Sequence, residues 1–377
     1  MRKNLLFIAM IPMLMGFQQA DRPAVSLPAP PAIAKPARVN LILTSGEKLA
    51  TQISGDAGVA GRAVTANDPV RIASVSKLVT ALGVMRLVDQ GKIDLDRDVG
   101  EYLGWRLRNP AFPGQIITLR MVLSHTSGLR DGAGYSLSPS DSLEQMLAKP
   151  EVWDSAHTPG AYFSYANLGS PVIAAVMERA SGEPFDQLMQ RLIFKPLALD
   201  ACFNWSGCSA ERRAQAVTLL RPNGDLARDP PLAAGQSECI FTRASDGSCD
   251  RSGYRLGYNG SAFGPQGGLR ISAQDLLRIA AVIKDQGKPL FSQSAFAEMI
   301  RPQWRFNGKN GDDLDGAFYG YGLGIDLQPD GWMGHVGDAY GLRAGLWVNS
   351  ATGEIRVRYA TMVDETTYVG SCLDRCP

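Results

Sequence analysis

The sequence predicts an α+β fold: an antiparallel sheet built from both chain ends, flanked by helices, with a mainly helical inserted domain. Three observations support this prediction. A strand-like segment opens the folded part at Val39–Leu43, and two more close it at Gly341–Val348 and Ile355–Met362. Between these ends, apolar residues recur mostly at helical spacing. A short polar connection, 349–353, joins the last two strands as a hairpin.

The first predicted elements of the fold place Ser74 at a junction between a strand and a helix. The opening strand ends at a Ser-Gly turn, and a second strand is predicted at Val70–Ala73. This strand runs directly into a helix over 74–91, in which apolar residues recur at helical spacing and Gly91 is a stop signal. Ser74 therefore lies where a strand passes into a helix.

The remaining elements follow from the same signals. Further helices are predicted at Leu119–Leu123, Ser142–Ala148, Ser170–Ala180, Phe185–Phe194 and Ser272–Asp285. The segment 202–260 is rich in Gly, Pro, Asp and Ser, and we interpret it as a long surface excursion held by two disulfides. A further strand is expected at Tyr321–Leu327.

The N-terminus has the composition of an export signal. Arg2 and Lys3 precede an apolar run, Leu5–Phe17, that is too short to span a bilayer comfortably, and Ala20 is a candidate cleavage residue. We expect a periplasmic or secreted protein with no membrane span after cleavage; an uncleaved N-terminal anchor is the alternative.

These signals divide the chain into five parts. We predict a signal peptide at 1–20, a Pro-rich linker at 21–38, a sheet domain formed by 39–80 with 255–363, a helical insertion with a disulfide-clipped loop at 81–254, and a C-terminal tail at 364–377.

The six cysteines support export, because disulfides persist in oxidising compartments. Six cysteines allow 15 connectivities, of which pairing between sequence neighbours is the simplest. This pairing joins Cys202 with Cys208, Cys239 with Cys249, and Cys372 with Cys376. Each such short loop would restrain the unfolded chain by about 2–3 kcal/mol.

Composition excludes several classes of function. With 38 basic and 37 acidic residues the net charge is +1, which provides no field to attract nucleic acid or anionic lipid. The chain has three histidines, with no HExxH motif and no paired CxxC motif, so a zinc site is not expected. We therefore expect no metal, no cofactor and no nucleic-acid partner, and the oligomeric state stays open.

Ser74 and Lys77 form the first candidate for catalytic chemistry. Three residues apart on the first turn of a helix, they share one face. The helix N-terminus favours negative charge on the serine oxygen, and a partly buried neutral lysine can accept its proton. The alternative is an ordinary helix N-cap beside a solvated lysine.

Two later segments offer further polar groups. Tyr165 and Asn167 stand two residues apart on an extended loop, so both can face one cleft. His335 and Gly337 begin the strand-rich end of the chain, where the glycine would let a substrate approach the backbone. The alternatives are a half-buried tyrosine beside a capping asparagine, and a partly exposed histidine in a Gly-rich turn.

Five segments occur in a characteristic order: IASVSK at 72–77, LSHTSGL at 123–129, YAN at 165–167, GGLRIS at 267–272 and HVG at 335–337. Together they resemble the serine β-lactamase and penicillin-binding-protein superfamily, in its class C-like branch. This branch holds β-lactamases, D-Ala-D-Ala carboxypeptidases, D-aminopeptidases and esterases. The resemblance covers roughly 39–362 and implies a β-lactamase/transpeptidase-like fold.

The resemblance also implies roles for individual residues. Ser74 resembles the acylated nucleophile, Lys77 its partner base, and Tyr165 the group that passes a proton to the leaving group. Asn167 resembles the residue that orients substrate, and His335 stands where many members have lysine. Together with Gly337 and Asp338, these two residues are expected to bind the substrate. The N–H groups of Ser74 and Asp338 would form the oxyanion hole. His125 matches a motif position with a structural role.

Two departures bear on the substrate. The middle of the third motif is Val336, where β-lactamases and carboxypeptidases usually have a threonine that helps bind a carboxylate. Asp338 adds a negative charge close by. We therefore expect an esterase, amidase or aminopeptidase acting on a small ester, amide or peptide through a Ser74 acyl-enzyme. The alternatives are a class C-like β-lactamase or D-Ala-D-Ala carboxypeptidase, and a non-catalytic binding protein on the same fold.

Overall fold

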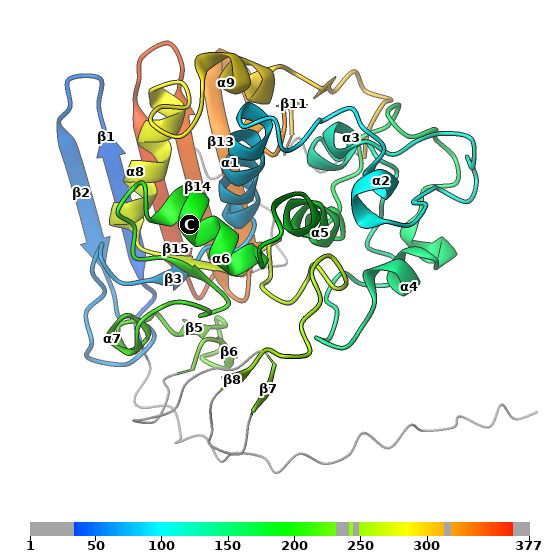
Figure 1. Cartoon of the computed structure of the whole chain (residues 1–377). Helices are drawn as coiled ribbons and strands as arrows, with labels where there is room; N and C mark the ends of the chain where they lie inside the picture. The colour runs from blue at the N-terminus through cyan, green and yellow to red at the C-terminus, as the bar shows by residue number, and fades with distance from the viewer. Residues whose placement is uncertain (1–33, 231–240, 244–248, 313–317, 365–377) are drawn as a thin grey trace, which may run out of the picture.

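The computed structural model describes residues 34–230, 241–243, 249–312 and 318–364. Its largest element is an eight-stranded sheet with the order β10-β11-β12-β13-β14-β15-β1-β2, in which every neighbouring pair is antiparallel. The N-terminal strand β1 (Arg38–Leu43) pairs with β15 (Ile355–Thr361) near the C-terminus, with Leu41 opposite Val357. Figure 1 shows this blue and red pairing. The predicted α+β sheet from both chain ends is confirmed.

The rest of the sheet is formed by one edge strand and five C-terminal strands. The edge strand β2 (Leu49–Ser54) is exposed along its whole length, whereas β14 (Leu342–Asn349) is buried along its whole length. The other strands are β10 (Trp304–Arg305), β11 (Gly320–Tyr321), β12 (Asp326–Leu327) and β13 (Trp332–Ala339).

Helix α1 (Val75–Asp89) lies at the centre of the molecule (Figure 1). Nearly all its residues are buried, because it contacts β13 and β14 of the sheet as well as helices α5 (Gly169–Ser181) and α9 (Gln293–Ile300). Helix α8 (Ala273–Lys284) packs on β14 and β15. Because of this central position, the first turn of α1 is buried between the sheet and the neighbouring helices.

The remaining helices are short, and three small sheets complete the described part of the fold. The helices are α2 (Val99–Leu103), α3 (Leu119–Leu123), α4 (Leu143–Leu147), α6 (Phe185–Met189) and α7 (Ala210–Ala214). A three-stranded sheet joins β3 (Val70–Arg71), β9 (Leu269–Ile271) and β4 (Cys202–Phe203). Two hairpins pair β5 (Leu219–Leu220) with β6 (Leu226–Arg228), and β7 (Thr242–Arg243) with β8 (Cys249–Asp250).

Several local predictions were wrong. The expected strand Tyr321–Leu327 is two strands, β11 and β12, separated by a turn in which Gly324 has a φ of 68°. The expected helix Phe185–Phe194 is α6 followed by a π-helical turn, Gln190–Phe194. Among the elements that sequence analysis missed are β2, α2, α9 and β13, the last because glycines interrupt its apolar pattern.

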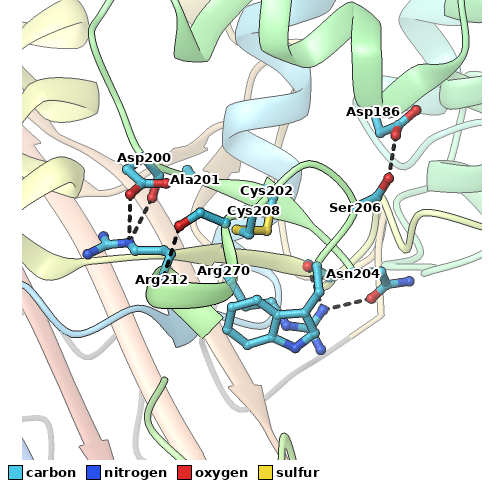
Figure 2. The surroundings of a disulfide bond; sticks show 12 residues. Asp186, Asp200, Ala201, Cys202, Asn204, Ser206, Cys208, Arg212 and Arg270 are labelled. Atoms are coloured by element: carbon cyan, nitrogen blue, oxygen red, sulfur yellow. Dashed lines mark hydrogen bonds and ion pairs between the residues drawn. A yellow bond between two sulfur atoms is a disulfide. The ribbon is translucent and has the colours of Figure 1, made fainter. Parts of the chain in front are cut away.

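The segment 202–260 is not only a surface excursion. Its first residues form β4, which pairs with the buried strand β9, and the side chains of Cys202 and Phe203 are buried. Cys202 and Cys208 form the predicted disulfide, with Cα atoms 5.4 Å apart, and Figure 2 shows Asn204 and Arg270 hydrogen-bonded beside it. Cys249 is also disulfide-bonded. Cys239, Cys372 and Cys376 lie outside the described residues.

The predicted signal peptide and most of the predicted linker and tail also lie outside the described residues. Within the described ranges, no helix combines the length and apolar character needed to cross a membrane.

Candidate active site

Ser74 stands at the junction of β3 and α1, as the sequence predicted. Its neighbour Ala73 has a φ of 46°, a left-handed conformation that costs a residue with a Cβ roughly 1–2 kcal/mol. Ser74 is the N-cap residue of α1, yet its side chain makes no capping hydrogen bond. Its Oγ instead lies 3.0 Å from Lys77 Nζ. The geometry thus excludes the simple N-cap interpretation.

Lys77 is buried against three acceptors. Besides Ser74 Oγ, its Nζ donates to Asn167 Oδ1 at 2.7 Å and to the main-chain oxygen of Gln266 at 3.0 Å. Only 6% of Lys77 is exposed, and burial lowers the pKa of its ammonium to about 7, partly opposed by the negative charge of Asp131. A lysine with this pKa is partly neutral near pH 7 and can accept a proton.

Asp131 orients Asn167. Sequence analysis did not identify Asp131 as a residue of the site. Its carboxylate accepts hydrogen bonds from the main-chain N–H of Asn167, from Asn167 Nδ2 and from the N–H of Leu168, each at 2.9 Å. Because Nδ2 is held by Asp131, Oδ1 of the same amide faces Lys77. The only sequence signal was its position two residues after the LSHTSGL segment, 123–129.

Tyr165 lies on the same loop as Asn167. The centre of its ring is 4.9 Å from Lys77 Nζ, and the ring stacks on Phe318 at 5.2 Å and lies 4.4 Å from the ring of His125. His125 holds this loop through two contacts: its main-chain oxygen accepts from Ser164, and its Nδ1 accepts from the N–H of Ala166. Burial keeps the pKa of His125 well below its usual value, so it is neutral.

His335 does not lie where a substrate-binding residue was expected. It is fully buried in the middle of β13, and it is not among the described residues that line the cavity beside Ser74. Its Nε2 is 2.9 Å from the Tyr321 hydroxyl and its Nδ1 is 2.6 Å from the main-chain oxygen of Val336. Burial lowers its pKa to about 3, so the neutral ring donates through Nδ1 and accepts through Nε2.

Gly337 packs tightly against the strand-to-helix junction, and its expected role of admitting substrate stays a prediction. A Cβ at this position would lie 2.2 Å from the main-chain oxygen of Ile72 and 3.1 Å from the nitrogen of Ser74. Only glycine therefore allows β13 to approach the strand-to-helix junction this closely.

A cavity of about 390 Å³ opens beside Ser74. Its wall is largely aromatic or apolar, and it is lined by Arg71, Ala73, Ser74, Tyr135, Tyr165, Asn167, Gln266, Gly267, Phe318, Val336, Asp338, Ala339 and Tyr340. The structure thus brings together Ser74, Lys77, Tyr165 and Asn167 and places Asp338 in the cavity wall. Across the described ranges, no group of three or more His, Cys, Asp or Glu residues is arranged to hold a metal ion.

Comparison with known proteins gives a match to a family model and to several characterised relatives. The family model described as Beta-lactamase matches residues 39–369. Esterase EstB of Burkholderia gladioli is 29% identical over 303 residues, which span 75% of this chain and 73% of the esterase. The D-alanyl-D-alanine-carboxypeptidase/endopeptidase AmpH of Escherichia coli is 32% identical over 185 residues, 48% of this chain and 44% of AmpH.

Solved structures share the fold. The D-amino acid amidase from Ochrobactrum anthropi SV3 superposes with a TM-score of 0.63 at 18% identity, over 87% of this chain and 86% of the amidase. The octameric penicillin-binding protein homologue from Pyrococcus abyssi gives a TM-score of 0.63 at 20% identity, over 88% of this chain and 70% of that one.

Proposed function

We propose that this chain, which belongs to the Beta-lactamase family, hydrolyses an ester or amide through an acyl-enzyme on Ser74. Membership of this family, whose members include an esterase and a carboxypeptidase, identifies the chain as a serine hydrolase. The roles of its individual residues are our proposal. The observation that carries it is the position of Lys77 Nζ, 3.0 Å from Ser74 Oγ and hydrogen-bonded to two further acceptors.

Those two acceptors orient the neutral amine. A neutral lysine has two N–H groups and one lone pair. When Asn167 Oδ1 and the main-chain oxygen of Gln266 accept the two N–H groups, the lone pair points to Ser74. The amine can then take the hydroxyl proton as Ser74 Oγ attacks the substrate carbonyl carbon.

The following steps use Tyr165 and the main chain. The tetrahedral intermediate carries a negative oxygen, which the N–H groups of Ser74 and Asp338 would hold, a contribution of about 3–4 kcal/mol in other hydrolases. Tyr165 lies beside Lys77 and can pass a proton to the departing oxygen or nitrogen. The Ser74 ester that remains is then cleaved by water, with the same groups removing the water proton.

We propose a small neutral ester or amide as the substrate. The cavity wall is largely aromatic and apolar, and Val336 offers no hydroxyl to a carboxylate. The esterase relative supports this choice, whereas AmpH supports the carboxylate-bearing alternatives.

The test is covalent labelling of the purified chain with a fluorophosphonate and with a fluorescent penicillin, followed by mass-spectrometric mapping of the adduct. Labelling of Ser74 by the fluorophosphonate alone supports an esterase or amidase. Labelling by both probes supports a penicillin-recognising enzyme instead. If neither probe labels Ser74, the proposal fails and the alternative of a non-catalytic binding protein on this fold is favoured.

We also propose that the chain acts in the periplasm or outside the cell. The apolar N-terminal run and the disulfide between Cys202 and Cys208 support this location. Fractionation of the native host, with detection by an antibody, tests it; recovery in the cytoplasm would contradict it.

A further inference from the structure

Asn204 binds the main-chain segment that supplies an acceptor to Lys77. The oxygen of Gln266 in this segment accepts from Lys77 Nζ at 3.0 Å. The main-chain N–H of Asn204 donates to the oxygen of Gly268 at 2.9 Å, and its side-chain Nδ2 donates to the oxygen of Ala262 at 3.1 Å. Asn204 therefore holds the chain both before and after Gln266.

The contact between Asn204 and this segment is tight. A Cβ on Gly264 would lie 2.9 Å from Asn204 Nδ2, and a Cβ on Gly268 would lie 2.8 Å from Asn204 Oδ1. Gly264 also has a φ of 64°, and its oxygen accepts from the N–H of Gly268. Glycines on both sides of Gln266 thus let the segment fold closely around the amide. Because of this close packing, a displacement of Asn204 would be transmitted to the Gln266 carbonyl.

Two buried arginines add to this connection. Arg71 and Arg270 are 8% and 3% exposed, and Asn204 Oδ1 accepts from both, at 3.1 and 2.7 Å. Arg71 lines the cavity and also donates to the oxygen of Gly267, at 2.9 Å. Asp229 forms an ion pair with each arginine. Since this one carboxylate serves two buried cations, removal of the Asn204 oxygen would leave both guanidiniums short of an acceptor.

A disulfide closes the loop that carries Asn204 (Figure 2). Asn204 and the next residue, Trp205, have φ angles of 45° and 62°, so two left-handed residues follow each other. Non-glycine residues keep such conformations when the surrounding structure fixes them. The bond between Cys202 and Cys208 and the pairing of β4 with β9 supply this restraint.

We propose that Asn204 is a positioning residue for Lys77. It fixes the Gln266 carbonyl, which accepts one N–H of the amine and so helps to direct the lone pair to Ser74. Without the Asn204 amide the carbonyl can move, the lone pair loses its direction, and proton transfer from Ser74 slows. This inference rests on the proposed role of Lys77 as the base.

The test replaces Asn204 with glycine, which adopts a left-handed φ without strain and removes the amide. We expect kcat/KM for 4-nitrophenyl acetate to fall about ten- to a hundredfold, the range for a displaced catalytic group. Rates are expressed per Ser74 that the fluorophosphonate labels, so that inactive protein does not contribute.

The pH profile distinguishes positioning from a general loss of stability. In Asn204→Gly the ammonium of Lys77 loses the firm acceptor at Gln266, so its pKa should fall and the rising limb of kcat/KM should move to lower pH. The other groups that face Lys77 are the same in both proteins: the negative Asp131 and the neutral His125 and His335.

Two variants serve as rescue and control. Asn204→Asp keeps the side-chain length and an oxygen for both arginines, so it should retain at least a third of the original kcat/KM. Asn67→Gly, at an exposed turn position, is the matched control and should change neither kcat/KM nor the limb. If Asn204→Gly does not fold, the Cys202→Ser, Cys208→Ser double variant frees the same loop and should show the same fall and shift.

The outcomes separate the two proposals. If the unaltered protein hydrolyses the ester but kcat/KM in Asn204→Gly stays within twofold, only this inference fails. A loss that Asn204→Asp shares in full would also overturn it, as would a fall in kcat/KM without a shift of the limb to lower pH. If the unaltered protein does not hydrolyse the ester and the fluorophosphonate does not label Ser74, the proposed function itself fails.

Discussion

Asp338 and Arg343 face each other across the β13–β14 hairpin and form an ion pair. Nε and Nη2 of Arg343 both donate to Oδ2 of Asp338, at 2.9 and 2.8 Å, and Arg343 is only 1% exposed. The charge of Asp338 is therefore balanced by a buried cation. The ion pair weakens the repulsion of a substrate carboxylate by Asp338. We therefore expect Val336, rather than Asp338, to set the proposed preference for neutral substrates.

The first prediction concerns that selectivity. Val336→Thr should raise kcat/KM for benzylpenicillin relative to a neutral aryl ester, because the new hydroxyl can donate to the carboxylate. Such a hydrogen bond contributes about 1.5–3 kcal/mol, or roughly ten- to a hundredfold. The ratio of the two kcat/KM values measures it. An unchanged ratio, or an unaltered protein that already prefers the penicillin, would show that position 336 does not set the preference.

Ser74→Ala should abolish labelling by the fluorophosphonate and change stability little. The side chain makes no capping hydrogen bond, so its removal should alter the free energy of unfolding by less than about 1 kcal/mol. Probe labelling and urea unfolding measure the two effects. Turnover within tenfold of the unaltered protein would disprove the role of Ser74 as nucleophile.

The pH dependence of kcat/KM should report the proton on Lys77. Because the neutral amine is the base and its pKa is about 7, kcat/KM should rise with pH through about 7 and then level off. Asp131 faces the amine with a negative charge, whereas the neighbouring His125 and His335 have lowered pKa values and are neutral.

In Asp131→Asn the charge that raises the pKa of Lys77 is removed, so the rising limb should move to lower pH. The plateau should also fall, because asparagine keeps only one of the two acceptor oxygens of Asp131, so at least one of the hydrogen bonds from Asn167 and Leu168 is lost. A limb that stays in place or moves to higher pH would contradict this assignment.

Gly337→Ala should impair activity more than folding. The added methyl group would meet the main-chain oxygen of Ile72 at 2.2 Å and the nitrogen of Ser74 at 3.1 Å, so β13 and the junction must separate. We expect at least a tenfold loss in kcat/KM for a neutral ester. Gly114→Ala, where a Cβ would meet no atom within 4 Å, is the control and should be neutral.

Non-reducing peptide mapping of the exported protein should recover three disulfides, Cys202–Cys208, Cys239–Cys249 and Cys372–Cys376. The first is present in the structure and closes a short loop. Its removal in the Cys202→Ser, Cys208→Ser double variant should lower the free energy of unfolding by about 2 kcal/mol, as measured by urea denaturation. Free thiols at these positions in the native protein would refute both the pairing and the export.

Local features of the site could be predicted from the sequence. The spacing of Ser74 and Lys77 places both side chains on one face as soon as α1 forms, because helical geometry is set by neighbours in the chain. The order of five short segments was enough to identify the family, and the strand-like segment Ile355–Met362 was correctly predicted as the strand β15. The same local reasoning failed for β13, whose glycines resemble a turn but serve close packing against Ile72 and Leu346.

What the sequence by itself determined is the chemistry that the chain carries: a serine and a lysine on one helix turn, a Tyr-x-Asn loop and the family of the fold. Only the tertiary structure decided how these groups behave. Asp131 reaches Asn167 across 36 positions, Gln266 reaches Lys77 across 189, and Arg343 neutralises Asp338. The burial that lowers the pKa of Lys77 and makes His335 neutral likewise comes from distant segments. Desolvation and long-range pairing depend on which surfaces meet in three dimensions, and no local pattern encodes that.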